Sequence, residues 1–343
     1  MKGDKNQMEI KEKTTNIFSS KNIITFIETL LTNKSMFIFI VMSLIAGALS
    51  PNFFTQTNIF NVLRQVAAAT VLGMGYSLVL GSGNIDLSVG FMMGLLGIIS
   101  AILDKIIGLP FYQTILITAF CGILCGLFNA LTINILNLPP FILTLASGQI
   151  FKGINYVISN TTAISVVSQQ WKVIGQGYIG IVPIPVYIAI IVTLIITIII
   201  YKTSFGRHII IVGGNPEAAR VSGLDVKRIR IGVYCLMGLL TAVASMIITG
   251  RALSSSPQSG QGMEMDAIAA AVIGGTPLGG GYSRPEGTFF GCLIVGLINN
   301  ILNLLAVNTN WQLAAKGAII ILAITLDSQS EKILQRLRLK AKL

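Results

Sequence analysis

Charged side chains are scarce in this sequence. Of its 343 residues, only 11% are Asp, Glu, Lys or Arg, whereas 53% are hydrophobic. A soluble domain carries about 25% charged residues, because its surface must face water. So few charges exclude an ordinary soluble fold and indicate an integral membrane protein.

Cysteine and histidine are also rare, with four cysteines and a single histidine, His208. The cysteines all lie inside apolar runs and none belongs to a CxxC pair: Cys121, Cys125, Cys235 and Cys292. This pattern argues against a disulfide framework and a zinc site, so we expect the cysteines to pack as small hydrophobic residues. We predict no metal site and no catalytic residue, and the absence of a His, Asp and Glu cluster disfavours a membrane-embedded enzyme.

Long apolar runs fill most of the chain. A helix needs about 20 apolar residues to cross a bilayer. Ten stretches come close to this length: 35–50, 60–80, 87–104, 112–132, 139–159, 183–201, 231–250, 267–280, 288–306 and 311–327. The first is short, and the eighth is short and rich in glycine. We therefore expect an all-α, polytopic membrane protein with about ten transmembrane helices.

The remaining residues form tails and loops. We predict a cytoplasmic N-terminal tail over 1–34, one transmembrane domain over 35–327 and a basic cytoplasmic tail over 328–343. Residues 22–31 alternate apolar and polar side chains at helical spacing, which fits either a helix lying along the membrane surface or an ordinary lead-in to the first span. None of the loops is large enough to fold as a separate domain.

The orientation follows from the basic residues. With ten spans and a cytoplasmic N-terminus, the cytoplasmic segments contain 18 of the 24 Lys and Arg residues, and the outer loops contain three. This asymmetry agrees with the positive-inside rule, whereas nine spans would place the basic C-terminus outside. The net charge of +11 is therefore a sign of topology, and we expect no nucleic-acid partner.

Glycine gathers at two places, Gly81 to Gly90 and Gly274 to Gly281. Irregular backbone at membrane depth is tolerated only inside the protein or along a water-filled cavity. These clusters therefore fit either close packing of small residues or a polar path with a moving joint. A third, GxxxG pattern within 121–126 is typical of helix packing alone.

A few polar residues stand close to or within the spans. Asp86, before the third span, suits a helix cap or a role in transport. Arg64, a turn into the second span, is expected to reach the nearer interface or to contact substrate. Asn299, Asn300 and Asn303 either hydrogen-bond between helices or face a hydrophilic path.

The loop 202–230 carries its own helix signal. Asn215 and Pro216 mark a helix start, EAAR follows, and Ser222-Gly223 marks the stop. We predict a helix of about two turns on the cytoplasmic side. A 29-residue loop is longer than a helix bundle needs, so we expect this projection to contact another molecule.

Several motifs of this sequence match those of a known protein family. The sequence resembles the permease subunits of bacterial ABC importers for monosaccharides, the ribose/xylose/galactoside group. Four motifs carry the likeness, at residues 83–90, 138–145, 213–223 and 266–281, and residues 299–327 also fit. The likeness extends in order over about 35–327. One departure is Asn84, where the family more often has glycine.

The resemblance implies that 213–223 is the coupling helix, which docks on a separate cytoplasmic ATPase. The coupling residues would be Gly213, Gly214, Asn215, Glu217, Ala218, Ala219, Arg220 and Gly223. The sequence itself contains no GxxxxGK[ST] phosphate loop, so we expect no cofactor on this chain and place ATP and Mg on the partner ATPase. The other implied partners are an extracytoplasmic sugar-binding protein, a second permease copy (identical or paralogous) and the lipid bilayer of the bacterial cytoplasmic membrane.

Polar and motif residues supply candidates for the substrate path or its gate. They are Asp86, Ser88, Phe141, Asn299, Asn300 and Asn303. Two alternatives remain open: an ABC permease for another small solute, such as a nucleoside or amino acid, and an ion-coupled secondary transporter. The second needs intramembrane carboxylates or broken helices, and Asp86 and Asp266 stand at expected span ends, which weakens it.

Overall fold

The computed structural model describes residues 34–308, 310–315, 317–318, 321 and 325. The predicted N-terminal tail with its surface helix, except for Lys34, lies outside this part of the chain. The basic tail 328–343 and much of the tenth candidate span, 311–327, lie outside it as well.

Helices account for most of the described chain, which confirms the all-α prediction. They are α3 (Lys34–Leu49), α4 (Gln56–Gly81), α5 (Val89–Lys105), α6 (Phe111–Leu136), α7 (Pro140–Ser159), α8 (Gln169–Gln176), α9 (Ile184–Lys202), α10 (Ser204–Gly214), α11 (Pro216–Val221), α12 (Val226–Ala252), α13 (Met263–Ile273) and α14 (Pro285–Leu304). Four two-residue strands form two antiparallel pairs. Strand β1 (Ile164–Ser165) pairs with β4 (Ser254–Ser255), and β2 (Tyr178–Ile179) pairs with β3 (Val182–Pro183).

Six helices in the described part are long and apolar enough to cross a membrane: α4, α6, α7, α9, α12 and α14. They match six of the ten candidate spans and support a multi-pass membrane protein. The candidates 35–50 and 87–104 correspond to α3 and α5, which have 16 and 17 residues. Among the described residues, six helices therefore meet the criterion of length and composition, and the predicted count of about ten is not confirmed.

The eighth candidate span, 267–280, does not form one helix. Helix α13 has 11 residues and ends at Ile273, and a glycine-rich loop follows it to α14. Gly275 and Gly280 in this loop have φ angles of +93° and +77°, which are conformations that glycine adopts at little cost. The apolar run therefore continues beyond the point where the helix stops.

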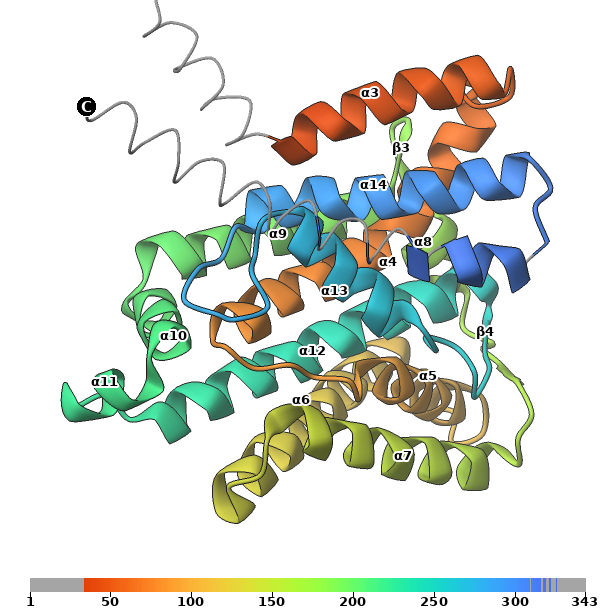
Figure 1. The fold of residues 1–343 in the computed structure, drawn as a ribbon. Coiled ribbons are helices and arrows are strands. Elements are labelled where there is room, and N and C mark those ends of the chain that lie inside the picture. The colour runs from red at the N-terminus through yellow and green to blue at the C-terminus, as the bar shows by residue number, and fades with distance from the viewer. Residues whose placement is uncertain (1–33, 309, 316, 319–320, 322–324, 326–343) are drawn as a thin grey trace, which may run out of the picture.

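Helix α4 lies at the centre of the bundle, with α12 beside it (Figure 1). Of the most apolar window of α4, 72% is buried inside the protein, against 22% for α9. Helix α3 packs on α14, and α7 packs on α5 on the other side of the molecule. The outward-facing sides of the outer helices are apolar, as a surface that faces lipid must be.

Helices α6 and α12 cross at glycines. A Cβ atom on Gly122 would lie 2.4 Å from the carbonyl oxygen of Gly238, and one on Gly126 would lie 2.0 Å from that of Tyr234. Only a residue without a side chain permits such a close approach of two backbones. The predicted packing role of the GxxxG pattern is therefore confirmed.

The two ends of the bundle differ. Helices α10 and α11 project from one end, where the loop between α13 and α14 also lies (Figure 1). Helix α8 and strand β4 lie at the opposite end. We call these the α11 end and the β-strand end.

Candidate functional site

The loop 202–230 contains two helices. Helix α10 begins after Thr203, whose hydroxyl oxygen accepts a hydrogen bond from the Gly206 amide at 3.1 Å. The sequence analysis missed α10, whose residues SFGRHIIIVGG are mostly weak helix formers; the available signal was Thr203, a residue type that commonly caps a helix start. The chain therefore leaves α9, passes through α10 and reaches α11 before it enters α12.

Helix α11 matches the predicted short helix. The Asn215 side chain accepts hydrogen bonds from the amides of Glu217 and Ala218 at 3.0 and 2.9 Å, so it caps the free N–H groups of the first turn. Gly223, with φ of +86°, ends the segment. The predicted start and stop are both confirmed.

The surface of α11 faces away from the bundle. Glu217 and Arg220 form an ion pair at 2.5 Å, and both side chains are about 70% exposed. Val221 at the helix end is 82% exposed, while Ala219 is buried toward the loop interior. Val221 and the ion pair therefore lie on the outer surface of the loop, and the sequence analysis did not single out Val221.

Gly213 has a different environment from the rest of the predicted coupling residues. It is buried, and a Cβ atom there would lie 2.0 Å from the Gly81 carbonyl oxygen and 2.7 Å from the Gly281 nitrogen. The Gly281 amide donates a hydrogen bond to that Gly81 oxygen at 3.1 Å. A Cβ on Gly280 would likewise lie 2.6 Å from the Gly83 Cα.

We call Gly81, Gly83, Gly213, Gly280 and Gly281 the glycine junction. It joins the end of α10, the end of α4 and the loop before α14 through backbone contacts. Both glycine clusters of the sequence therefore meet at the base of the loop that carries α11. Close packing of small residues accounts for these positions.

Residues 82–88 are an irregular, non-helical segment inside the protein between α4 and α5. Its backbone is satisfied by side chains of other helices: the hydroxyls of Tyr76 and Tyr234 donate to the carbonyls of Asp86 and Ile85 at 2.6 and 3.2 Å. The Leu87 amide donates to the Thr144 hydroxyl at 3.0 Å. This arrangement lets non-helical backbone lie within a membrane protein.

Asp86 and Ser88 are fully buried in this segment. The Asp86 Oδ1 atom accepts hydrogen bonds from the Ser88 amide and hydroxyl at 2.9 and 2.6 Å, and Asn129 donates to the Ser88 hydroxyl at 2.8 Å. Ser88 is the residue before α5, so the Asp86 carboxyl positions the helix start rather than capping the amides of the first turn.

The other path candidates lie elsewhere. Phe141, at the start of α7, is 48% exposed. Asn300 exchanges two hydrogen bonds with Asn58 of α4, at 3.0 and 2.7 Å, so it links two helices. Asn299 and Asn303 instead line a cavity of about 270 Å³ between α4, α12, α13 and α14. The six candidates therefore do not form one cluster.

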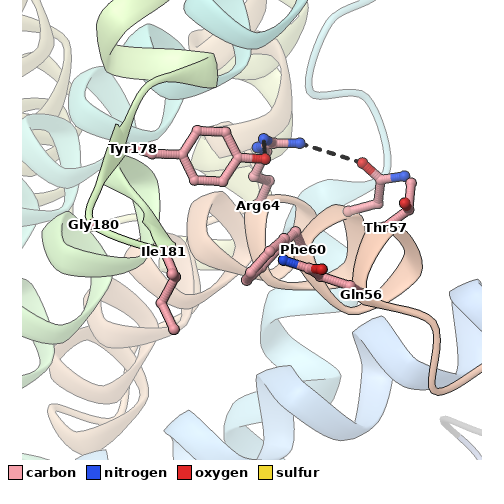
Figure 2. A pocket seen from close by; sticks show the side chains of 8 residues that line it. Gln56, Thr57, Phe60, Arg64, Tyr178, Gly180 and Ile181 are labelled. Atoms are coloured by element: carbon pink, nitrogen blue, oxygen red, sulfur yellow. Dashed lines mark hydrogen bonds between the residues drawn. The ribbon is translucent and has the colours of Figure 1, made fainter.

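A second cavity, of about 390 Å³, lies at the β-strand end between the start of α4 and the β2–β3 hairpin (Figure 2). Arg64 donates hydrogen bonds to the Tyr178 hydroxyl and to the side-chain Oδ1 atom of Asn61 at 3.4 Å. Its guanidinium carbon lies 4.7 Å from the Tyr178 ring centre. Arg64 therefore packs on an aromatic ring at this end of the bundle.

Metal-ligating side chains do not gather among the described residues, where no group of three or more His, Cys, Asp or Glu lies close enough to hold an ion. The chemistry available to the described sites is hydrogen bonding by amides, hydroxyls and single charged groups.

Comparison with known proteins places the chain in a family. Residues 58–324 match the family described as branched-chain amino acid transport system / permease component. The chain is similar to the ribose import permease protein RbsC of Bacillus subtilis, with 38% identity over 291 residues that cover 84% of this chain and 89% of that protein.

Other similar proteins are also named as sugar permeases. The ribose import permease protein RbsC of Haemophilus influenzae is 35% identical over 303 residues, which cover 87% of this chain and 94% of that protein. The xylose transport system permease protein XylH of Escherichia coli K12 is 34% identical over 341 residues, covering 82% and 87%. No solved structure matches the chain. The chain therefore belongs to this family of transport permeases, in the group of the ribose and xylose permeases that its motifs resemble.

Proposed function

We propose that this chain is the membrane-spanning subunit of an ATP-binding-cassette importer and forms the path for a monosaccharide such as ribose or a related sugar. The family description names amino acids, whereas the relatives described above are named for ribose and xylose. The similarity to sugar permeases covers more than four fifths of the chain, which favours a sugar. ATP hydrolysis belongs to a partner, so the chain itself is not an enzyme.

The proposed topology has about ten crossings with both termini in the cytoplasm of a bacterial cell. Two observations support crossings beyond the six long helices. Helices α3 and α5 are nearly long enough, and the loop after α13 returns to the α11 end, where the Gly281 amide bonds to Gly81. An 11-residue helix rises only about 16 Å, so α13 and this loop together would make one crossing.

Helix α11 is the single observation that carries the coupling proposal. It projects from the same end of the bundle as the loop after α13 (Figure 1), with its charged and apolar side chains exposed. We propose that residues 213–223 dock on the ATPase, which binds ATP and Mg. The glycine junction at the end of α10 would transmit this movement to the end of α4 and to the loop before α14. Its residues have no side chains that could shift and absorb the displacement.

We assign the other proposed partners to two further surfaces, the β-strand end and the exposed apolar sides of the bundle. A sugar-binding protein would deliver its ligand at the β-strand end, opposite α11. A second permease copy and lipid would cover the exposed apolar sides of helices such as α9, whose most apolar window is only 22% buried. Along the path itself, Asp86, Ser88, Phe141, Asn299, Asn300 and Asn303 remain our candidates for contact or gating.

Charge reversal at Glu217 tests the coupling proposal. We expect Glu217→Lys to lower ATP-driven sugar uptake at least tenfold in membranes that contain the complete transporter, because it places a cation on the docking face. The exposed ion pair itself contributes little to stability. The double variant Glu217→Lys/Arg220→Glu restores an ion pair within the helix but not the original surface, so it should stay defective.

Gly223 provides an independent test with a matched control. Gly223→Val and Gly108→Val both place a branched side chain at an exposed glycine with positive φ, +86° and +74°, and nothing within 4 Å. Each costs about 1–2 kcal/mol of backbone strain, but only Gly223 borders α11. Uptake should fall for Gly223→Val alone. Normal uptake in both Glu217→Lys and Gly223→Val would contradict the coupling assignment.

A further inference from the structure

The cavity beside Asn299 lies within the half of the bundle nearer the β-strand end. Gln65 is in the third turn of α4, Arg251 is near the end of α12, Asp266 is in the first turn of α13, and Asn303 is near the end of α14. Four helices thus contribute polar side chains to one cavity. The preceding residue on α4, Arg64, borders the other cavity shown in Figure 2.

Asn299 is the most informative residue of this cavity. Its side chain is 91% buried, and its Oδ1 atom has no hydrogen-bond partner among the described residues. Leaving a buried amide oxygen unpaired costs about 1–3 kcal/mol. A bound molecule with a hydroxyl group would supply the missing donor, so this atom points to a ligand.

The neighbouring amides are held in fixed orientations. Gln312 donates from Nε2 to the Asn303 Oδ1 atom at 3.0 Å and to the Val307 carbonyl at 2.9 Å. Both donors of that amide are therefore used, which sets the direction of its acceptor oxygen. Preoriented amides of this kind discriminate between ligands by hydrogen-bond geometry.

The chemistry of the lining fits a neutral, polyhydroxylated ligand. Amide groups both donate and accept, as sugar hydroxyls do, and the lining also includes one guanidinium, Arg251, and one carboxyl, Asp266. Val66, Ala69 and Ile248 add apolar wall, against which the C–H face of a sugar ring packs. The volume of about 270 Å³ far exceeds the ~10–15 Å³ that one water needs in this measure, so the cavity has room for one monosaccharide.

We propose that this cavity binds one monosaccharide during transport, with Gln65, Asn299 and Asn303 as its hydrogen-bonding residues. The inference rests on the proposed function and adds to it a location and a set of contacts. Gln65 and the cavity's two charged residues were not among the path candidates from sequence, and the buried Asn299 oxygen supplies the reason to place sugar here.

The first test measures uptake of radiolabelled ribose by proteoliposomes that contain the permease, its ATPase and its binding protein. We expect Asn299→Leu and Gln65→Leu each to lower uptake about tenfold, because each removes hydrogen bonds to the sugar. Stimulation of the ATPase by the loaded binding protein should persist, because Gln65 and Asn299 lie inside the bundle and not on either proposed docking surface. Thr193→Val, which removes a hydroxyl that bonds only within α9, should leave uptake within twofold of wild type.

Two outcomes of that test separate the cavity from the function. Uptake within twofold of wild type in both Asn299→Leu and Gln65→Leu would overturn the cavity assignment and leave the importer proposal standing. A wild-type transporter that moves neither ribose nor xylose with ATP would instead overturn the sugar proposal itself, and with it the sugar site.

A second measurement does not depend on how the Asn299 variant folds. Ala69→Cys places a thiol on the cavity wall. Its labelling by a methanethiosulfonate reagent is measured after subtracting the labelling of the wild-type protein, which has four cysteines of its own. Millimolar ribose should slow the labelling at least threefold, while leucine and NaCl should not. Labelling slowed by NaCl but not by sugar would assign the cavity to a cation and overturn the inference, as would labelling that ribose does not change.

Discussion

Gly213→Ala is expected to destabilise the protein strongly, while Gly214→Ala leaves its stability unchanged. A Cβ atom on Gly213 would lie 2.0 Å from the Gly81 oxygen and 2.7 Å from the Gly281 nitrogen, whereas the nearest atom to a Cβ on Gly214 is 3.7 Å away. Backbone atoms cannot rotate away, so the first substitution must separate α10 from α4. Overpacking of this kind costs about 1–3 kcal/mol.

The measurement is thermal unfolding of the purified permease in detergent, with wild type and both variants side by side. The expected result is a lower unfolding temperature for Gly213→Ala only, together with reduced ATP-driven uptake, since the glycine junction connects the α11 loop to the bundle. Equal unfolding temperatures for the two variants would contradict the close backbone contact at this junction.

Gly126→Leu is expected to prevent assembly of the folded permease. A Cβ atom there would lie 2.0 Å from the Tyr234 carbonyl oxygen, so a leucine must push α6 away from α12. The displacement would also move the Tyr234 hydroxyl, which donates to the Ile85 carbonyl at 3.2 Å. The substitution therefore damages both a helix crossing and the support of the non-helical segment 82–88. We expect the free energy of unfolding to fall by more than about 3 kcal/mol.

Gly153→Leu on α7 is the matched control, because it is also a helical glycine but has nothing within 4 Å of its Cβ position. Size-exclusion chromatography of the detergent-solubilised protein reports the outcome. We expect a single symmetric peak for Gly153→Leu and aggregated or missing protein for Gly126→Leu. A normal peak for Gly126→Leu would show that the α6–α12 contact is looser than the structure indicates.

Apolar runs and local caps are sequence signals of this fold. The runs at 60–80 and 231–250 are predominantly apolar and about as long as a membrane crossing requires, and both form long helices, α4 and α12. The Asn215 cap and the Gly223 stop act within a few residues of one another, so α11 was predictable in position and length. Signals of this kind do not depend on the rest of the molecule.

Features that depend on distant segments had no such signal. In the run 267–280, Gly274, Gly275 and Pro277 mark the stop of its helix after Ile273, but the path of the loop that follows depends on contacts with Gly81 and Gly213. Hydropathy describes the environment of a segment and not its backbone path. The glycine junction was therefore visible only as two separate glycine clusters.

The candidate path residues also divide into features that local sequence predicts and features that depend on how distant segments pack. Asn299 and Asn303 are four residues apart and share one helix face, whereas Asn300 points to another neighbour, Asn58. This difference was predictable from helical spacing. That Gln65 of α4 would complete the same cavity was not, because it depends on how the helices pack.

The most direct test of the central claim is the energy source for transport. Proteoliposomes are prepared with the permease, its ATPase and its sugar-binding protein, and ribose uptake is followed with the sodium and proton gradients collapsed. The account predicts uptake that requires ATP on the side of α11 and the presence of the ATPase. Uptake driven by a sodium or proton gradient, without ATP or the ATPase, would contradict it.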